Sequence, residues 1–420
     1  MNNKILLSIF CFIYAWLAPA QSTLLLPSHL FDGTNLRENM AVLVTQGRIE
    51  AVGKLGSFNL PPGTDTLQME GMTLLPGLIE GHSHLLLHPY NETTWNDQVL
   101  VESEAERVVR ATAHARKTLE AGFTTVRDLG TEGAGYADLG LKAAIDKGIV
   151  PGPRMLCAGP AIVATGTYGP KGFAPGVDVP QGAEEADGHD GLIKAVRGQI
   201  GKGVDLVKVY ADYRWGKPGE AHPTFSLEEL RLMVETARSG GRDVVAHAGT
   251  PEGMRRAVLA GVTTIEHGDG GTWEVFQLMR EKGVALCPTL AAGDAIAQYR
   301  GWRKGIDPEP ERIRQKRVSF QLALKAGVTI CAGGDVGVFA HGDNVRELEL
   351  MVEYGMKPLD VLKSATSVNA QVFRLEPEAG FVRPGYGADL LAVTGRPDLH
   401  ISDLRQVAWV MKAGKVVVKR

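Results

Sequence analysis

Two kinds of hydrophobic pattern alternate along most of the chain. Short apolar runs of β type recur at 78–79, 124–127, 155–158, 206–209, 244–246, 263–265, 285–287 and 329–331. Amphipathic helical patterns separate them, and the clearest covers 103–121, with Val108, Val109, Ala111, Ala115 and Leu119 on one face. Eight apolar strands that alternate with helices are typical of a parallel α/β fold, and their number favours a (β/α)8 TIM barrel.

Glycine marks the ends of most of these predicted helices. Further helical patterns cover 141–147, 192–200, 227–237, 252–259, 273–280 and 313–325. A glycine precedes the next strand at Gly122, Gly148, Gly203, Gly241, Gly261, Gly283 and Gly327. We expect these glycines to adopt positive φ at the position that follows each helix.

The two ends of the chain have a different pattern, with short strands and turns. The predicted strands cover 40–44, 48–52, 73–75, 388–393, 407–412 and 415–418, with a hairpin turn at Gly414. This pattern predicts a small composite β-sandwich domain built from residues 21–76 and 376–420. The barrel is then expected over 77–375.

The first twenty residues have the pattern of an export signal. A polar start with one positive charge at Lys4 precedes an apolar run over 5–17, and Ala18-Pro19-Ala20 supplies small residues for a signal peptidase. We expect a signal peptide over 1–20 and an exported protein, periplasmic or secreted, that has no membrane attachment after cleavage. An uncleaved anchor and a buried helix are the alternatives.

The composition narrows the functional classes. Hydrophobic residues make up 44% and charged residues 22% of the chain, which is ordinary for a folded soluble protein. The formal net charge is −3 and no run of like charges reaches five residues, so nucleic-acid binding is not expected. Cys157, Cys287 and Cys331 lie in separate apolar runs, which indicates buried thiols and no cysteine zinc site.

Polar residues that can bind metals gather at the carboxyl ends of the predicted strands, which form the catalytic face of a TIM barrel. They are His82, His84, Lys208, His247, His267 and Asp335. Residues two apart on a strand share a face, so His82 and His84 can reach one ion. His247 and His267 end consecutive strands about 4.8 Å apart. Lys208 lies between two valines, where an unpaired ammonium is costly unless it is chemically altered.

Each of these residues also has an ordinary structural interpretation. His82 and His84 can be exposed on an edge strand, and His247 and His267 can be hydrogen-bonded interior histidines. Asp335 suits a glycine-rich turn, and Lys208 can point outward between helices. The six residues together indicate a metal site more specifically than any one of them does alone.

Several motifs resemble the amidohydrolase superfamily. They are LPGLIEGHSHL, DLVKVYAD, VVAHAGTPEG, TTIEHGDG, CAGGDVG, ELELMVEYGMKPLDVLKSAT and PGYGADLLAV. The sequence is most similar to the imidazolonepropionase-related branch, which includes metal-dependent dipeptidases and carboxypeptidases. The loop GTYGPKGFAPGVDVPQGAEEADG resembles that of the amidohydrolases that cleave ochratoxin. Many relatives have Gly-Gly-His-Gly in this loop, whereas here it reads Gly166-Thr167-Tyr168-Gly169.

The resemblance implies roles for the candidate ligands. His82 and His84 would bind one divalent ion with Asp335, and His247 and His267 would bind a second. Lys208 would be carboxylated by CO₂ and would bridge the two ions. Zinc suits this ligand set, and manganese or cobalt can replace it. Asp335 would be the catalytic residue that takes a proton from the attacking hydroxide and delivers it to the leaving amine.

The leading hypothesis is a binuclear-metal hydrolase that removes a C-terminal, hydrophobic amino acid from a small amide or dipeptide. Tyr168, Tyr210 and Arg214 are the candidates to hold the substrate carboxylate. The long loops 160–190, 211–225 and 289–311 contain Tyr168, Phe173, Tyr213, Trp215, Tyr299 and Trp302, which predicts large apolar pocket walls.

Three alternatives remain beside this hypothesis. The loop aromatics can instead pack subunits together, in the homo-oligomer that we expect. Other superfamily branches hydrolyse cyclic amides or deaminate azoles. A non-catalytic binding protein would be expected to lack some of the six ligands, all of which are present here.

Overall fold

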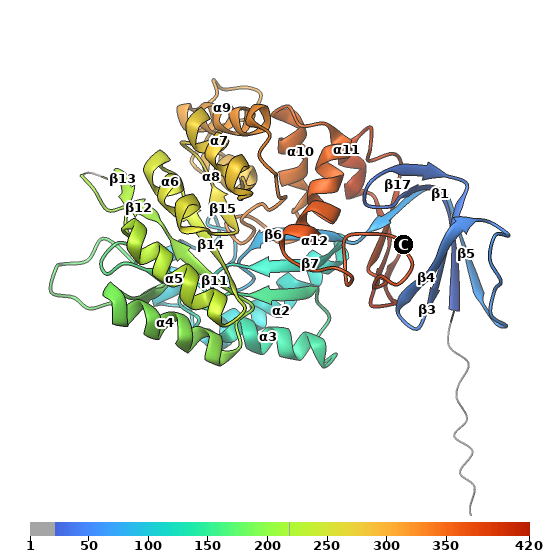
Figure 1. Cartoon of the computed structure of the whole chain (residues 1–420), viewed down its shortest axis with the longest axis horizontal. Coiled ribbons are helices and arrows are strands. Elements are labelled where there is room, and N and C mark those ends of the chain that lie inside the picture. Colours follow the sequence, from blue (N-terminus) through green and yellow to red (C-terminus); the bar gives the residue numbers. More distant parts are fainter. Residues whose placement is uncertain (1–21, 218) are drawn as a thin grey trace, which may run out of the picture.

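A closed parallel barrel and a separate mixed sheet make up the molecule (Figure 1). The computed structural model describes residues 22–217 and 219–420. The predicted signal peptide over 1–20 therefore lies outside the described residues. Within the described ranges, no helix has both the length and the apolar character that a membrane span needs.

Seven strands of the barrel coincide with the predicted apolar runs. They are β6 (Leu78–Ser83), β7 (Phe123–Asp128), β8 (Arg154–Cys157), β11 (Leu206–Tyr210), β14 (Asp243–Ala248), β15 (Thr264–His267) and β16 (Ala285–Cys287). Neighbouring pairs are parallel. Every residue of β6, β7 and β11 is buried, because one face lines the barrel interior and the other packs under helices.

The eighth strand is reduced to a short bridged segment that closes the barrel. Ile330 pairs in parallel with Leu286 of β16, and the Gly81 amide of β6 donates to the Ala332 carbonyl at 2.9 Å. The Asp205 amide donates to the Cys157 carbonyl at 2.8 Å, which joins β8 to the segment that leads into β11. The predicted TIM barrel is thus confirmed.

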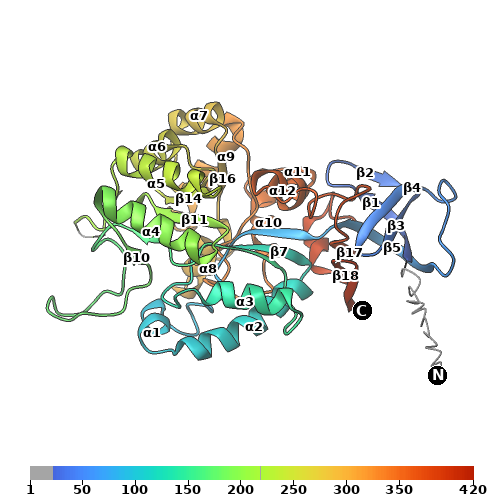
Figure 2. The same cartoon turned by 60° about the horizontal axis from the view of Figure 1, so that its bottom comes forward.

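Helices cover the outside of the barrel, and α2, α3 and α4 lie beside strands β7 and β11 in Figure 2. They are α2 (Glu104–Glu120), α3 (Ala137–Asp146), α4 (Gly188–Lys202), α5 (Leu227–Ser239), α6 (Pro251–Ala260), α7 (Trp273–Lys282), α9 (Glu311–Ala326) and α10 (Val345–Glu353). The Ser103 hydroxyl accepts from the Glu106 amide and starts α2. All seven predicted helix-end glycines have positive φ, between 68° and 98°.

Two sequence predictions on helices are wrong. The 289–311 segment is not a plain loop, because it contains α8 (Leu290–Tyr299). The carboxylate of Glu347, on α10, accepts hydrogen bonds from the first two amides of α8, at 3.0 and 2.6 Å. Val109 does not join the buried face of α2, since 69% of its surface is exposed.

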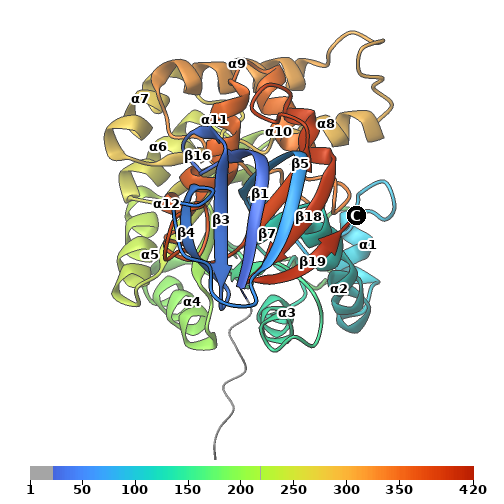
Figure 3. The same cartoon turned by 90° about the vertical axis from the view of Figure 1, so that its right-hand side faces the viewer.

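The two chain ends meet in one eight-stranded sheet, in which the blue and red strands lie side by side in Figure 3. Its strands are β1 (Ser22–Phe31), β2 (Leu36–Glu38), β3 (Met40–Thr45), β4 (Arg48–Lys54), β5 (Asp65–Pro76), β17 (Leu390–Thr394), β18 (Val407–Lys412) and β19 (Lys415–Lys419). Strand β5 pairs antiparallel with β17 across more than 300 residues of sequence. Leu25, Val42, Leu390 and Trp409 belong to a hydrophobic core of this sheet. Its sandwich packing and the domain boundaries stay predictions.

The remaining elements are short and connect the larger ones. They are α1 (Trp95–Leu100), β9 (Ile162–Val163), β10 (Glu184–Glu185), β12 (Asp212–Arg214), β13 (Ala221–Pro223), α11 (Pro358–Lys363), a π-helical turn (Ser364–Val368), α12 (Asn369–Val372) and a 3₁₀ turn (Ile401–Arg405). Cys157, Cys287 and Cys331 are free, buried thiols, as the sequence predicts.

Candidate active site

Six polar side chains, which we call the floor, gather at the carboxyl ends of the barrel strands. They are His82, His84, Lys208, His247, His267 and Asp335. The imidazoles form a continuous series, with ring centroids 5.3 Å apart for His84 and His82, 5.1 Å for His82 and His267, and 4.4 Å for His267 and His247. The structure therefore brings together side chains from strands far apart in sequence.

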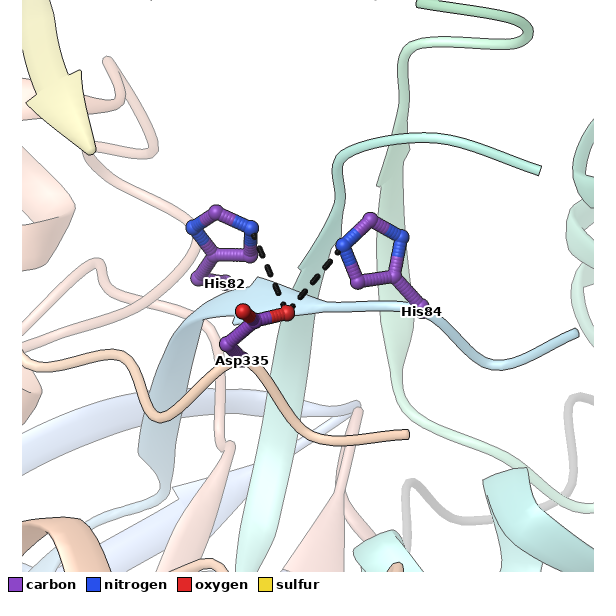
Figure 4. A group of neighbouring side chains, drawn as sticks. All are labelled: His82, His84 and Asp335. Atoms are coloured by element: carbon purple, nitrogen blue, oxygen red, sulfur yellow. Dashed lines mark ion pairs between the residues drawn. The ribbon is translucent and has the colours of Figure 1, made fainter. Parts of the chain in front are cut away.

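Asp335 lies against both histidines of the first strand, as Figure 4 shows. Its Oδ1 is 3.3 Å from His84 Nε2 and 3.7 Å from His82 Nε2. The potential ligand atoms of the three residues all lie within 4.8 Å of one another. This is a compact set of nitrogen and oxygen donors of the kind that divalent zinc prefers.

The turn that carries Asp335 is held in an uncommon conformation. Asp335 has φ of 63°, in the left-handed region that residues other than glycine seldom adopt. Its amide donates to the His82 carbonyl at 2.9 Å. Buried Glu80 accepts from the amides of His82 and Gly334, at 3.0 and 2.8 Å. These bonds fix the Asp335 turn directly against strand β6.

Three histidines have their Nδ1 atoms occupied by the protein. His84 Nδ1 lies 2.8 Å from the Gly130 carbonyl, and His267 Nδ1 lies 2.7 Å from the Thr289 hydroxyl. His82 Nδ1 lies 2.9 Å from the carboxylate of Glu266. Metal-binding histidines commonly use one ring nitrogen in this way, which fixes the ring and leaves the other nitrogen for the ion.

A buried ion pair supports His82 from inside the barrel. The Arg127 guanidinium lies 2.8 Å from Glu266 Oε1 and also donates to the Gly81 carbonyl at 2.7 Å. Arg127 and Glu266 are at most 2% exposed. Sequence analysis missed both residues, because the ion pair joins two strands that are 139 positions apart.

Burial and neighbouring charges together set the protonation of the floor. Burial would lower the pKa of His84, but its contact with Asp335 outweighs burial and raises the value to about 9. Burial, together with the charge of Lys208, lowers the pKa of His82 to about 4 and that of His247 to about 3. Burial would raise the pKa of Asp335, but His82 and His84 outweigh it and lower the value to about 2. At neutral pH the Asp335 carboxylate is charged, whereas His82 and His247 are neutral and have lone pairs available for a metal.

Lys208 lies in the barrel interior, as predicted, and is 1% exposed. No described residue forms a hydrogen bond or an ion pair with its Nζ, which lies 5.5 Å from the Tyr210 ring centroid. Burial lowers the pKa of this amine. The other buried lysine, Lys316, is instead paired with Asp269 and donates to the His267 carbonyl at 2.7 Å. Lys208 is therefore an unpaired buried amine whose charge acts on His82, His247 and His267.

Above the floor is a cavity of about 430 Å³. Its wall, as we use the term, consists of Glu132, Tyr168, Tyr210, Tyr213 and Arg214, all of which line the cavity. Tyr210 stacks on His247 with centroids 4.5 Å apart, and Tyr168 lies 4.8 Å from Tyr210 and 4.9 Å from Tyr213. The three predicted substrate contacts, Tyr168, Tyr210 and Arg214, thus reach the same cavity as the floor.

The prediction of six aromatic wall residues is only partly correct. Tyr168 and Tyr213 line the cavity, whereas Phe173, Trp215, Tyr299 and Trp302 do not. Phe173 and Trp215 are 46% and 51% exposed. Aromatic content alone did not tell which loop residues point inward.

Other cavity residues carried no signal in the sequence. Glu132 follows β7 in a loop that has no recognisable motif, and Arg312 lies at the start of α9, where a charged residue suggests a solvated surface. Arg312 lies 3.5 Å from Asp269, which also lines the cavity. Only the tertiary arrangement brings these charges to the site.

Comparison with known proteins agrees with this geometry. The sequence profile of the amidohydrolase family matches residues 73–417. The chain is 31% identical to an ochratoxinase of Aspergillus niger over 418 residues, which cover 92% of this chain and 84% of that protein. An imidazolonepropionase of Salinispora arenicola is 23% identical, over 87% of this chain and 88% of that protein.

Solved structures of similar proteins have the same fold. An Xaa-Pro dipeptidase with bound methionine in its active site has a TM-score of 0.82 and 32% identity, over 94% of this chain and 99% of that chain. The A. niger ochratoxinase structure has a TM-score of 0.81 and 27% identity, over 96% of both chains. Profile, sequence and structure thus agree, and the chain belongs to the amidohydrolase family.

Proposed function

We propose that this enzyme is a binuclear-metal hydrolase that cleaves the amide bond to a C-terminal, hydrophobic amino acid. The observation that carries the proposal is that five floor residues line one cavity while Lys208 lies buried on β11, where its charge acts on His82, His247 and His267. The similarity to an ochratoxinase and to an Xaa-Pro dipeptidase supports the amide-bond part of it.

The floor residues fit a pair of divalent metal ions, for which zinc is the expected element. His82, His84 and Asp335 would hold one ion, and His247 and His267 the other. Lys208 would bridge them after its amine adds to CO₂, which forms a carbamate and releases one proton. This reaction suits an unpaired buried amine whose pKa is lowered by burial. Bound divalent ions lower the pKa of a water to about 7 and polarise a carbonyl.

The protein's own acid–base group is Asp335. Its low pKa keeps it ionised, so that it can accept a proton from the attacking water. The same carboxyl group then delivers that proton to the nitrogen of the leaving amino acid. The Glu80 contacts and the His82 carbonyl hold the backbone turn that carries this carboxyl group.

The wall supplies groups for the rest of the substrate. Arg214 of the wall and Arg312, which lies elsewhere on the cavity, both line it. A guanidinium group suits the free carboxylate of a C-terminal amino acid. The rings of Tyr168, Tyr210 and Tyr213 offer an apolar surface with hydroxyl groups at its edge. A bulky apolar side chain would lie against these rings.

Three substrates test the proposal. Metal-loaded enzyme should hydrolyse an N-acyl-phenylalanine faster than its methyl ester and faster than the corresponding N-acyl-glycine. Equal rates on the ester and the free acid would contradict the carboxylate contact, and equal rates on glycine and phenylalanine would contradict the apolar contact. Hydrolysis of cyclic amides in place of all three would overturn the proposed reaction.

A further inference from the structure

Glu132 is a buried carboxylate of the wall that has no part in the mechanism above. It lies in the loop that follows β7 and is 3% exposed, yet it lines the cavity. Its φ of 51° is in the left-handed region, which residues other than glycine seldom adopt. Such a conformation persists where the surroundings hold it in place.

The surroundings of Glu132 do hold it. Buried Arg107 donates to the carbonyls of Leu86, Thr131 and Glu132 at 3.1, 2.9 and 2.8 Å. One carboxylate oxygen of Glu132, Oε2, accepts from Trp95 Nε1 at 2.9 Å and from the Tyr168 hydroxyl. Backbone and side chain are both fixed, so this carboxylate is a preorganised acceptor.

The second oxygen of Glu132 has no donor from the protein. Among the described residues none donates a hydrogen bond to Oε1, and the nearest base is His84 Nδ1 at 3.9 Å. That nitrogen already lies 2.8 Å from the Gly130 carbonyl. A carboxylate has about four acceptor positions, and a buried one is stabilised chiefly by a cation or several donors. Oε1 therefore offers a charged acceptor to a group in the cavity.

Glu132 and a cluster of charges around Asp269 line opposite sides of the cavity. Glu132 follows β7, the second strand in barrel order, whereas Asp269 follows β15, the sixth. Asp269 is paired with both Arg312 and Lys316, which leaves that side net positive. In a ring of eight strands the second and the sixth lie opposite each other. A negative side facing a positive side suits a zwitterionic substrate.

We propose that Glu132 determines specificity by receiving a primary ammonium group on the acyl side of the scissile amide. This inference rests on the proposed function and narrows its substrate to amides whose acyl group is cationic. Glu132 lies beside His84, a floor residue, so the ammonium must be close to the reacting carbonyl. The α-ammonium of a dipeptide is about 2.5 Å from its carbonyl carbon, given standard bond lengths. An α-ammonium therefore fits better than one at the end of a long side chain.

The test compares substrates that differ by one amine. Wild-type enzyme should cleave alanyl-phenylalanine with a kcat/KM roughly 10- to 100-fold above that for propionyl-phenylalanine, the range for a hydrogen bond between charged groups. The kcat/KM for ε-aminocaproyl-phenylalanine should exceed that for caproyl-phenylalanine by a smaller factor, because the ammonium of the first substrate is far from its carbonyl. A larger gain for this second pair would assign Glu132 to a side-chain ammonium instead.

The variant Glu132→Gln distinguishes the effect of the negative charge of Glu132 from the effect of its hydrogen bonds within the protein. The amide oxygen of glutamine can still accept from Trp95 and Tyr168, but the negative charge is lost. The alanyl-to-propionyl ratio should fall to near one, with propionyl-phenylalanine hydrolysis retained. Glu281→Gln, an exposed position on α7, is the matched control and should keep the wild-type ratio. Metal content and thermal unfolding of each variant establish that it is folded.

Two outcomes overturn the inference without touching the proposed function. One is that wild-type enzyme hydrolyses alanyl-phenylalanine and propionyl-phenylalanine at similar rates, a result that needs no variant. The other is a high ratio that Glu132→Gln leaves unchanged. If the metal-loaded wild type cleaves none of the four amides, the proposed function fails and the inference fails with it.

Discussion

The floor and the wall of the cavity hold their polar groups in different ways. Floor residues stand on barrel strands or directly after them, and His82, His84 and His267 each have a ring nitrogen bound to a neighbouring barrel segment. Most wall residues stand outside the barrel strands, on loops or on the short strand β12, and Tyr210 alone among the five ends a barrel strand. Their tyrosine rings contact one another. Wall residues other than Tyr210 can thus change without altering a barrel strand, whereas a floor residue is coupled to the barrel. We therefore assign the chemistry to the floor and substrate selection to the wall.

Glu132 sharpens this comparison because it belongs to the wall yet is held as firmly as a floor residue. Trp95 and Tyr168 donate to its carboxylate, and Arg107 donates to its carbonyl and to that of the preceding Thr131. Arg214 is the opposite case, since it is exposed and its guanidinium lies 5.9 Å from the Tyr213 ring centroid. The wall thus combines one rigid acidic group with a looser basic one.

The largest expected effect comes from removing a floor histidine. His82→Ala or His84→Ala should lower kcat by more than the ~10–100-fold that loss of a ligand's supporting residue costs. The control variants His29→Ala and His400→Ala lie in or beside the end sheet and should keep full activity. Steady-state kinetics and metal content measure both sets. Retained activity in His84→Ala would contradict the assignment of the chemistry to the floor.

Lys208→Ala should be nearly as damaging, because the bridging carboxylate that we propose on this residue would be lost. Short carboxylic acids added to the variant should restore part of the activity by occupying the same place. In the wild type, mass spectrometry of metal-loaded protein should find one carboxyl group added on Lys208 and none on Lys316, which is already ion-paired. An unmodified Lys208 in active protein would rule out the carbamate.

Glu266→Gln should weaken metal binding at the His82 site by roughly 10–100-fold, the usual cost of losing a ligand's supporting carboxylate. The reason is that Glu266 holds the His82 ring and is itself held by Arg127. Titration with a competing chelator measures the affinity. Glu378→Gln removes a glutamate paired with Arg48 far from the floor and serves as the control. Equal affinities in both variants would show that the ion pair has no role at the metal site.

The smallest effect is expected on the wall. Arg214→Ala should raise KM for substrates with a free carboxylate by roughly 10-fold, the lower end for a hydrogen bond to a charged group. The turnover number kcat should change little, because Arg214 does not touch the floor. The methyl ester of the same substrate should show no change in KM. A drop in kcat with unchanged KM would show that Arg214 acts in the chemical step and not in substrate binding.

The difference between floor and wall also explains what could be predicted from sequence. A strand places alternate side chains on one face, so the spacing of His82 and His84, and their position at a strand end, already indicated a shared ligand site. The helix-end glycines were predictable for a similarly local reason, since φ at that position depends on the adjacent turn. These features need no knowledge of the rest of the chain.

The features that were missed depend on contacts between distant segments. Helix α8 has no side-chain cap of its own, and its first two amides donate to Glu347 from α10. The Arg127–Glu266 pair joins two strands across the barrel. The position of Glu132 in the cavity depends on hydrogen bonds from Arg107 and Tyr168, which lie elsewhere in the chain. No local pattern encodes such hydrogen bonds, and so the supporting residues of the site emerged only with the fold.

The most direct test of the central claim is the metal content of active enzyme. Elemental analysis of purified, active protein should give two divalent ions per chain. A chelator should abolish hydrolysis of N-acyl-phenylalanine, and Zn²⁺ should restore it together with the two-ion content. Full activity in protein that contains no metal would contradict the account, because the floor would then have a different chemical role.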